Sequence, residues 1–525
     1  MLRNLQLSPT PGSPEELTLF NRVQERLAHL FRVVFDEPDA PRTVVVIPSL
    51  SLDHEVLQRI SGVHHYEERM LCMLMLLRLP RTRLIYITSQ SLDVSVIDYF
   101  LNLLPGVPVG HARKRLLLFN CHDASGVPLS LKLLQRPRLL ERIRRAIPDP
   151  LAAHLTCFNV TPLERTLAVQ MGIPLYGCNP VYAEFGSKTG SREVFHEAGI
   201  DLPPGFENLR DKKDMIDSLV ALRLANPHLR KAVVKLNEGF SGEGNAIFRF
   251  EGCPEKEKAL QKWLGSEVAQ RLEFQAKGES WDTFSVKFAE MGGVVEAFIE
   301  GEGKRSPSVQ CRVNPLGEPM IVSTHDQILD GQVFLGCTFP ADEVYRLQIQ
   351  AAGQLVADVL ARRGVIGRFG VDFISVPEAD GWRHYAIEIN LRKGGTTHPF
   401  MMLQYLTDGE FDLASGLYLT PSGQPRYYYA TDNLHDEAYI GLSPEDLIDI
   451  SVCRRLHFHG ATQQGVVFHL IGALSEFGKL GAVCIAENPS RAFQLYHHTV
   501  DTLQSEGRSQ NMRVNVNEAI TPLVG

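Results

Sequence analysis

The stretch that decides the fold reads Tyr-Ala-Ile-Glu-Ile-Asn-Leu-Arg-Lys-Gly-Gly and occupies residues 385–395. Its alternation of apolar and polar residues predicts a short strand that runs into a glycine-containing loop. Residues two apart on a strand point to the same face, so Glu388 and Asn390 present a carboxylate and an amide oxygen side by side. Such oxygen ligands suit Mg²⁺, which shares its coordination shell with nucleotide phosphates. Arg392 follows in the same phase and offers a forked donor to a phosphate or carboxylate.

A third acid lies upstream, in the apolar run Phe-Gly-Val-Asp-Phe-Ile-Ser-Val at residues 369–376. The polar loop that follows contains an Asp-Gly pair between two strand-like runs, which predicts a β-hairpin. Folding the hairpin about this loop brings Asp372 opposite Glu388, with a register uncertainty of about one or two residues. A charge in an apolar strand needs a partner or a metal. We therefore predict a Mg²⁺ site at Asp372, Glu388 and Asn390; a surface hairpin with solvated acids is the alternative.

The composition is that of a soluble globular protein. The 525 residues predict two to four domains, and the apolar fraction of 44% and charged fraction of 22% are ordinary. A net charge of -8, with no Lys/Arg stripe, argues against nucleic acid as the main partner. Nine cysteines without a C-x-x-C pair favour a reducing, cytoplasmic setting. The sequence shows no signal pattern or apolar run long enough to span a membrane, so we expect no membrane association.

Three regions differ in their patterns. Residues 1–185 alternate strand-like and helical segments, which predicts an α/β domain with a parallel sheet. They lack a G-x-G-x-x-G turn, so dinucleotide binding is not predicted. Residues 186–405 contain β-hairpins around glycine-rich turns and predict an α+β module. Residues 406–525 predict a small α+β domain with helices at 444–455 and 490–503.

Two lysines accompany segments suited to phosphate binding. Residues 186–192 (Gly-Ser-Lys-Thr-Gly-Ser-Arg) predict the start of a helix, where Lys188 and backbone N–H groups would face phosphate; a solvated lysine explains this segment equally well. Lys235 ends a predicted strand before the loop Glu-Gly-Phe-Ser-Gly-Glu-Gly at 238–244. Glycines there let the backbone approach phosphate, and we expect the loop to be a mobile lid. Glycine-rich loops are common, so the predicted phosphate site depends on finding this loop together with Lys188 and the hairpin of Asp372 and Glu388.

Residues 294–303 (Val-Val-Glu-Ala-Phe-Ile-Glu-Gly-Glu-Gly) predict a strand that ends in an acidic turn. Its exposed backbone could pair with the edge of an adenine ring, and a carboxylate beyond it with ribose hydroxyls. By itself, the segment is better explained as an ordinary strand with a polar turn.

Taken in order, these five segments resemble the ATP-grasp superfamily over residues 186–400. Four stretches are similar to the pheganomycin-type peptide ligase group: residues 186–192, His-Tyr-Glu-Glu-Arg at 65–69, the run from Glu388 to Pro399, and residues 468–481. The resemblance implies a parallel-sheet pre-ATP-grasp domain, an ATP-grasp module of two α+β subdomains and a small C-terminal α+β domain.

The resemblance also implies ATP and Mg²⁺ as cofactors, with the metal on the three residues named above. Arg392 would face the transferred phosphoryl group or the substrate carboxylate. Many superfamily members carry an arginine where this chain has Gly370, so Arg368 or Arg312 would replace that charge. Glu302 would hold ribose, with Glu300 as the alternative. The implied ATP contacts are Lys188, Lys235, Ser241, Gly242, Gly244, Glu296, Ala297, Phe298, Ile299 and Glu302.

Together with the resemblance, these observations predict an ATP-dependent carboxylate–amine ligase. A carboxylate donor would attack the γ-phosphate, and an amine acceptor would then displace phosphate from the acylphosphate. The resemblance implies that both substrates are amino acids or peptides. Two alternatives stay open: an ATP-dependent small-molecule kinase on the same fold, and a nucleotide-binding regulatory protein without catalysis. The intact acidic set argues against the second. The oligomeric state is left open, a homo-oligomer included.

Overall fold

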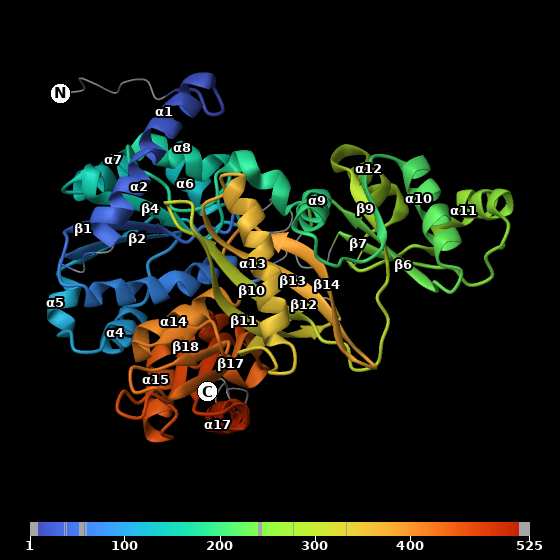
Figure 1. Cartoon of the computed structure of the whole chain (residues 1–525). Helices are drawn as coiled ribbons and strands as arrows, with labels where there is room; N and C mark the ends of the chain where they lie inside the picture. Colours follow the sequence, from blue (N-terminus) through green and yellow to red (C-terminus); the bar gives the residue numbers. More distant parts are fainter. Residues whose placement is uncertain are drawn as a thin grey trace, which may run out of the picture. The chain divides into compact units, whose positions relative to one another are not determined.

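The protein is described from a computed structural model (Figure 1). The structure describes residues 9–35, 37, 39–51, 57, 60–239, 244–276, 278–331 and 333–513. The chain divides into two compact units. The first comprises Met1–Gly177, Gly336–Pro340 and Gly394–Gly525, and the second Cys178–Leu335 and Ala341–Lys393. The three-domain division with boundaries at 185 and 405 stays a prediction.

The N-terminal part of the first unit is built on a parallel sheet in the order β3-β2-β1-β4. Every residue of β1 and β4 is buried, as a sheet covered on both faces requires. Helices α1, α6, α7 and α8 share one core with these strands, and the Tyr86 hydroxyl of β2 donates to the Glu67 carbonyl of η2 at 2.6 Å (Figure 1). The predicted parallel α/β arrangement is confirmed. The elements are α1 (Pro14–Gln24), α2 (Arg26–Leu30), η1 (Phe31–Phe35), β1 (Arg42–Ile47), η2 (Val63–Arg78), β2 (Thr82–Thr88), α4 (Val94–Asn102), α5 (Val109–Arg113), β3 (Leu116–Asn120), α6 (Leu129–Leu134), α7 (Pro137–Ala146), η3 (Pro150–Ala152), β4 (Ala153–Cys157) and α8 (Pro162–Met171).

The C-terminal part of the first unit is an antiparallel sheet in the order β15-β16-β17-β19-β18. Residues 336–339 of β12 also pair with β17. The long helix α17 packs on this sheet, where Tyr429 stacks on Tyr496 with ring centroids 4.2 Å apart. The predicted closing helix is confirmed but runs past Leu503 to Arg513. The elements are β12 (Val333–Phe339), α14 (Thr397–Thr407), β15 (Glu410–Asp412), β16 (Leu417–Leu419), β17 (Pro425–His435), η5 (Glu437–Tyr439), α15 (Pro444–Cys453), β18 (Gly465–His469), η6 (Ile471–Ala473), α16 (Leu474–Phe477), β19 (Lys479–Ala486) and α17 (Pro489–Arg513).

The second unit contains two antiparallel sheets, as the predicted α+β module requires. One has the order β5-β9-β6-β7-β8 and shares a core with helices α10, α11 and α12 (Figure 1). The other has the order β14-β13-β10-β11. The elements are η4 (Pro180–Gly186), α9 (Lys188–Ala198), β5 (Gly205–Leu209), α10 (Lys212–Ala225), β6 (Lys231–Leu236), β7 (Asn245–Arg249), α11 (Glu257–Arg271), β8 (Glu273–Phe274), α12 (Trp281–Met291), β9 (Gly293–Ala297), β10 (Pro307–Val313), β11 (Pro319–Asp330), α13 (Arg346–Arg362), β13 (Gly367–Glu378) and β14 (Gly381–Asn390).

Helix α13 covers one face of the second of these sheets (Figure 1). A Cβ added at Gly353 of α13 would lie 2.7 Å from the Val309 side chain, and the Cys311 thiol donates to the Gly353 carbonyl at 3.7 Å. Val371 lies opposite Val309 and so shares its face. The odd-numbered residues of β10 and β13 therefore form the core beneath α13, and the even-numbered residues face the other way.

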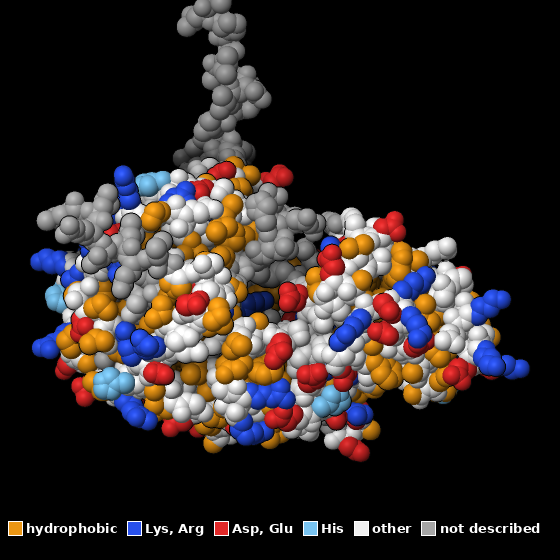
Figure 2. Space-filling view, turned by 90° about the horizontal axis from the view of Figure 1, so that it is seen from above, with side chains coloured by type: hydrophobic (Ala, Val, Ile, Leu, Met, Phe, Trp, Pro, Cys, Tyr) orange, Lys and Arg blue, Asp and Glu red, His pale blue; other side chains and the backbone are white. Residues whose placement is uncertain are grey.

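Surface charge is mixed in sign. On the face seen in Figure 2, Lys and Arg side chains alternate with Asp and Glu, and hydrophobic side chains lie between them. Across the described parts of the chain, no helix combines the length and apolar content that a bilayer span requires.

Gly190 in α9 allows a close approach that no other residue permits. A Cβ at this position would lie 2.0 Å from the Glu184 carbonyl oxygen in η4. We expect Gly190→Ala to reduce the free energy of unfolding by about 1–3 kcal/mol through overpacking. The matched control is Gly265→Ala in α11, where nothing lies within 4 Å of an added Cβ. That change should leave stability equal or higher by up to about 1 kcal/mol, because alanine favours helix.

Thermal unfolding followed by circular dichroism measures both Gly190→Ala and Gly265→Ala. An equal melting temperature for the two variants would show that the contact of Gly190 with η4 contributes nothing to stability.

Candidate nucleotide and cation site

The hairpin of β13 and β14 brings two carboxylates together. Near its turn Glu378 pairs with Gly381, but further along Asp372 pairs with Glu388 and Phe373 with Ala386. Ile387 is thus an extra residue, a β-bulge in β14. A regular hairpin from the same turn would place Ile387 opposite Asp372; the bulge places Glu388 there instead. Because directly opposed residues of antiparallel strands share a face, the predicted pairing of the two acids is confirmed.

Asn390 joins the two acids. Its Nδ2 donates to Asp372 Oδ2 at 2.9 Å and to Glu388 Oε1 at 3.2 Å. On the other side, Gln327 Nε2 of β11 donates to Asp372 Oδ1 at 2.8 Å. Gln327 was not predicted as part of the site, because its contact reaches from β11 across the intervening strand β10 to β13. No local pattern carries that information.

Lys188 completes the acidic cluster. Its Nζ forms an ion pair with Glu388 Oε2, and the neighbouring Ser191 hydroxyl accepts a hydrogen bond from the Ile389 N–H at 3.0 Å. Helix α9 is therefore fixed directly against the strand that carries Glu388. These contacts confirm that Lys188 and the 388–390 segment meet, as the two separated patterns suggested.

At the start of α9, the Lys188 side chain rather than the backbone N–H groups is available to a ligand. Ser187 caps the helix through the Gly190 N–H at 2.9 Å, and Gly199 ends it with φ +66°, as predicted. The Lys188 and Thr189 N–H groups donate to the carbonyl and side-chain oxygens of Asn237 at 3.1 and 3.0 Å. Because these N–H groups already have partners, only the ammonium of Lys188 is presented.

The two carboxylates of the hairpin differ in their affinity for protons. Burial, reinforced by the negative charge of Glu388, raises the pKa of Asp372. Burial acts in the same direction on Glu388, but the Lys188 ammonium outweighs it and lowers the pKa of Glu388. Glu388 is therefore held in its ionised form, whereas Asp372 needs a further cation nearby in order to ionise.

The donor set fits Mg²⁺. Two carboxylates and an amide converge on one point, which suits a small cation that prefers oxygen ligands. In this structure the Asn390 amide nitrogen and the Lys188 ammonium contact the two carboxylates. Rotation of the Asn390 side-chain amide would present its oxygen to a cation instead. A bound cation would also supply the charge that Asp372 needs in order to ionise.

Lys235 belongs to a second buried charge cluster. Its Nζ pairs with Glu296 Oε2, and Arg192 Nη1 donates to Glu296 Oε1 at 2.9 Å. Arg192 Nε also donates to Glu207 at 2.8 Å. Burial raises the pKa of Glu296, but the two cations outweigh burial and lower it overall. Glu296 is therefore an ionised partner for Lys235; its predicted contact with ATP stays a prediction. Arg192 was not predicted as part of the site.

The remaining predicted ATP contacts lie around the ends of β9 and β7. Ala297 ends β9, and the Phe298 ring, just beyond it, lies between Lys231 and Lys304 at 5.2 and 4.7 Å. Glu300 pairs with Arg230 and Lys231, whereas Glu302 is exposed. The Gly244 carbonyl accepts from the Leu236 N–H at 2.9 Å. Ser241 and Gly242, with most of the predicted lid, lie outside the described residues; Ile299 directly follows Phe298.

Two of the three predicted arginines lie on the face that carries Asp372. Arg312 of β10 is directly opposite Arg368 of β13, and Gln310 is opposite Gly370 between them and the acid. Arg392 lies just after β14, and its Nη1 donates to the Lys393 carbonyl at 3.2 Å. Which arginine contacts the transferred phosphoryl group stays a prediction.

Known proteins resemble this chain in sequence and in fold. The family described as IQCH-like, ATP-grasp matches residues 180–277 and 255–414, and the PGM1 C-terminal domain matches 446–499. Over 465 residues, the chain is 30% identical to the L-propargylglycine–L-glutamate ligase of Streptantibioticus cattleyicolor, covering 87% of this chain and 93% of the relative. This chain belongs to the ATP-grasp ligases. The resemblance stated from sequence motifs is thereby confirmed.

More distant relatives extend the comparison. The chain is 21% identical to IQ motif-containing protein H of Danio rerio, covering 90% of this chain and 49% of that protein, about half its length. A solved biotin carboxylase complex from Campylobacter jejuni covers 89% of this chain and 95% of its own, with a TM-score of 0.51 at 13% identity. That likeness concerns the fold alone. The ligase is thus an enzyme on the ATP-grasp fold, as the sequence predicted.

Glu388→Gln and Asn390→Ala test the cation site. We expect either change to lower ATP turnover at least about 100-fold, because a cation loses an oxygen ligand where phosphoryl charge must be neutralised. The matched control is Asp380→Asn, an exposed acid in the turn of the same hairpin. ADP release measured over a range of Mg²⁺ concentrations reads out all three. Near-normal turnover by Glu388→Gln at ordinary Mg²⁺ would remove the assignment.

Proposed function

We propose that this ligase joins the carboxylate of one amino acid or peptide to the amine of another, converting ATP to ADP and phosphate. The observation that carries the proposal is the bulge that sets Asp372 opposite Glu388, with Asn390 and Lys188 bound to the same cluster. The relative from Streptantibioticus cattleyicolor is named for joining two amino acids, and we extend that substrate class to this chain.

In the first step a substrate carboxylate oxygen attacks the γ-phosphorus of ATP. The bond between that phosphorus and the β–γ bridging oxygen breaks, giving an acylphosphate and ADP. Lys188 and Lys235 neutralise phosphate charge, and the fold fixes both on rigid elements, α9 and β6. Bound Mg²⁺, held by Asp372, Glu388 and Asn390, would supply further positive charge at the phosphates. Such a site works by positioning and charge neutralisation rather than by a covalent enzyme intermediate.

In the second step the amine attacks the acyl carbon. The carbon–oxygen bond to phosphate breaks, phosphate leaves with the former carboxylate oxygen, and the nitrogen loses a proton to give the amide. Activation is necessary because a carboxylate is a poor electrophile, whereas phosphate is a good leaving group. The chain's task here is to hold the acylphosphate away from water until the amine arrives.

We assign the arginines by their places on the strands. Arg368 and Arg312 lie on the sheet face of Asp372 and would stabilise the transferred phosphoryl group. Arg392 follows the cation-binding strand directly and would orient the substrate carboxylate with its forked donors.

The cysteines favour a cytoplasmic location. None of the nine forms a disulfide, and most are buried, which suits a reducing compartment. We accordingly propose that the ligase acts on small molecules of the cytoplasm.

A kinase on the same fold would share the first step but release a stable phosphorylated product. The ligase relative favours the two-step reaction. Incubation with ATP, a pool of amino acids and one ¹⁸O-labelled carboxylate donor distinguishes the two. We expect ADP, an amide detected by mass spectrometry, and ¹⁸O in the released phosphate.

Three results of the labelling experiment would contradict the proposal. AMP with pyrophosphate would indicate adenylation, unlabelled phosphate would indicate plain ATP hydrolysis, and a stable phosphorylated donor would indicate the kinase.

Arg392→Lys tests the assignment of the carboxylate-orienting residue. Lysine keeps the charge but loses the fork, so we expect KM for the carboxylate donor to rise about tenfold or more, with KM for ATP nearly unchanged. The control is Arg383→Lys on the same strand, where the arginine is exposed and pairs with Asp201. A rise in KM for ATP alone would place Arg392 at the nucleotide instead.

A further inference from the structure

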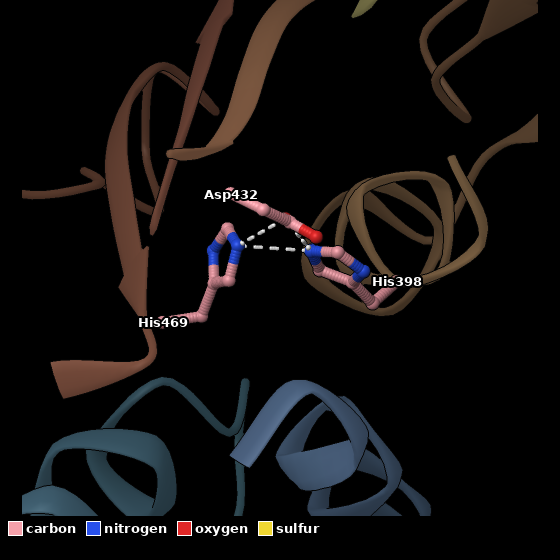
Figure 3. Close-up of side chains that lie close together, drawn as sticks. All are labelled: His398, Asp432 and His469. Carbon is pink, nitrogen blue, oxygen red and sulfur yellow. Dashed lines mark hydrogen bonds and ion pairs between the residues drawn. The ribbon is translucent and has the colours of Figure 1, made fainter. Parts of the chain in front are cut away.

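Three side chains from separate elements of the first unit meet at one point (Figure 3). His398 lies at the start of α14, Asp432 near the end of β17 and His469 at the end of β18. His469 Nε2 lies 2.8 Å from Asp432 Oδ1, His398 Nε2 lies 3.0 Å from the same oxygen, and the two Nε2 atoms are 2.9 Å apart. One nitrogen of each ring and one carboxylate oxygen thus form a nearly equilateral triangle.

The backbone is shaped to aim two of these side chains. In β17, Thr431 pairs with Ala482 and Leu434 with Leu480, so Asp432 and its neighbour form a β-bulge opposite a single residue of β19. Bulges commonly redirect a side chain. The single residue is Gly481, which pairs with His469 on its other side. A Cβ on Gly481 would lie 2.0 Å from His469 Nε2, so only glycine leaves room for the imidazole in this position.

A fixed arginine sets the orientation of the carboxylate. Arg69 Nη1 donates to Asp432 Oδ2 at 3.2 Å, which occupies the oxygen that points away from the histidines. The guanidinium is itself held by the rings of Tyr66 and Phe158, at 4.4 and 4.9 Å. Oδ1 is therefore left to the two imidazoles. Outer contacts of this kind orient carboxylate ligands in metal sites.

Hydrogen bonding alone explains this triangle poorly. Both imidazoles direct the same ring nitrogen at one oxygen and at each other, so their lone pairs and protons compete within 3.0 Å. A cation bound by all three removes that competition. Ligands about 2.1 Å from a metal lie about 3.0 Å apart at right angles and about 3.4 Å apart at tetrahedral angles, so the spacing of 2.8–3.0 Å is nearer to a facial arrangement of two histidines and one carboxylate.

We propose that His398, Asp432 and His469 bind one divalent transition-metal ion, with Zn²⁺ as the representative species. Two imidazoles and one carboxylate prefer such an ion to Mg²⁺, whose ligands are oxygens. The histidines are 6% and 5% exposed, whereas Asp432 is 13% exposed, so solvent reaches the site along the aspartate. Three protein ligands leave coordination positions open for water or a small-molecule ligand. The site contains none of the residues assigned to ATP, and this inference does not depend on the proposed function.

The test uses the full-length protein, stripped with a chelator and dialysed into millimolar Mg²⁺, which keeps oxygen-ligand sites occupied. Co²⁺ serves as the spectroscopic probe and Zn²⁺ as the calorimetric one. We expect one equivalent of Co²⁺ with visible d–d absorption, one saturating equivalent of Zn²⁺, and a rise in melting temperature with Zn²⁺. His398→Gln and His469→Gln should each weaken Zn²⁺ binding by more than about tenfold.

Two further variants separate a metal site from a purely structural network. Gly481→Ala keeps all three ligands but displaces the His469 ring, and we expect it also to weaken Zn²⁺ binding. His435→Gln removes an exposed histidine on the same strand as Asp432 and should bind Zn²⁺ like the original chain. Melting curves without metal establish that each variant is folded.

The proposal is overturned if the unmodified protein takes up no stoichiometric Co²⁺ or Zn²⁺. Equal Zn²⁺ affinity in the original chain and in folded His398→Gln would overturn it as well. Should the glutamine variants not fold, an unchanged Co²⁺ spectrum in Gly481→Ala decides against it. Each of these results leaves ADP release at the ATP site as an independent readout, so failure of one assignment is distinguishable from failure of the other.

Discussion

The pairing of Asp372 with Glu388 is the constraint on which the ATP-grasp module depends. The two carboxylates lie on one face of the sheet and are partly removed from solvent, so they repel each other unless cations lie beside them. The protein supplies one permanent cation, Lys188, and an amide, Asn390, that bridges both acids. The negative charge that stays unbalanced supports the proposal that a divalent ion binds to this cluster.

Other parts of the second unit serve to hold this pairing in place. Ser191 fixes α9 to the strand of Glu388, and Asn237 ties the start of the same helix to the end of β6. Gly190 lets η4 approach the same helix closely. Lys235 is held in turn by Glu296 and Arg192. Lys188 and Lys235, the two lysines proposed to bind phosphate, are therefore each paired with a carboxylate.

The sequence was sufficient wherever one local pattern decides the structure. The Asp-Gly turn and flanking alternation predicted the β13–β14 hairpin, and Ser187 with Gly199 predicted the limits of α9. The sequence was insufficient to predict contacts between residues on different strands or helices. Gln327 of β11 contacts Asp372 of β13 across the intervening strand β10, and the bulge at Ile387 determines which residue of β14 lies opposite Asp372. The triangle of His398, Asp432 and His469 depends on three elements whose meeting no spacing reveals.

We propose that Asp372, Glu388 and Asn390 hold a divalent cation beside the phosphates of ATP. Anomalous diffraction from crystals grown with Mn²⁺ and a non-hydrolysable ATP analogue would locate this cation. We expect a Mn²⁺ peak within about 2.3 Å of oxygens from all three side chains, with Lys188 released from Glu388 toward phosphate. A nucleotide bound with no Mn²⁺ peak at these oxygens, and the Lys188–Glu388 pair intact, would contradict it.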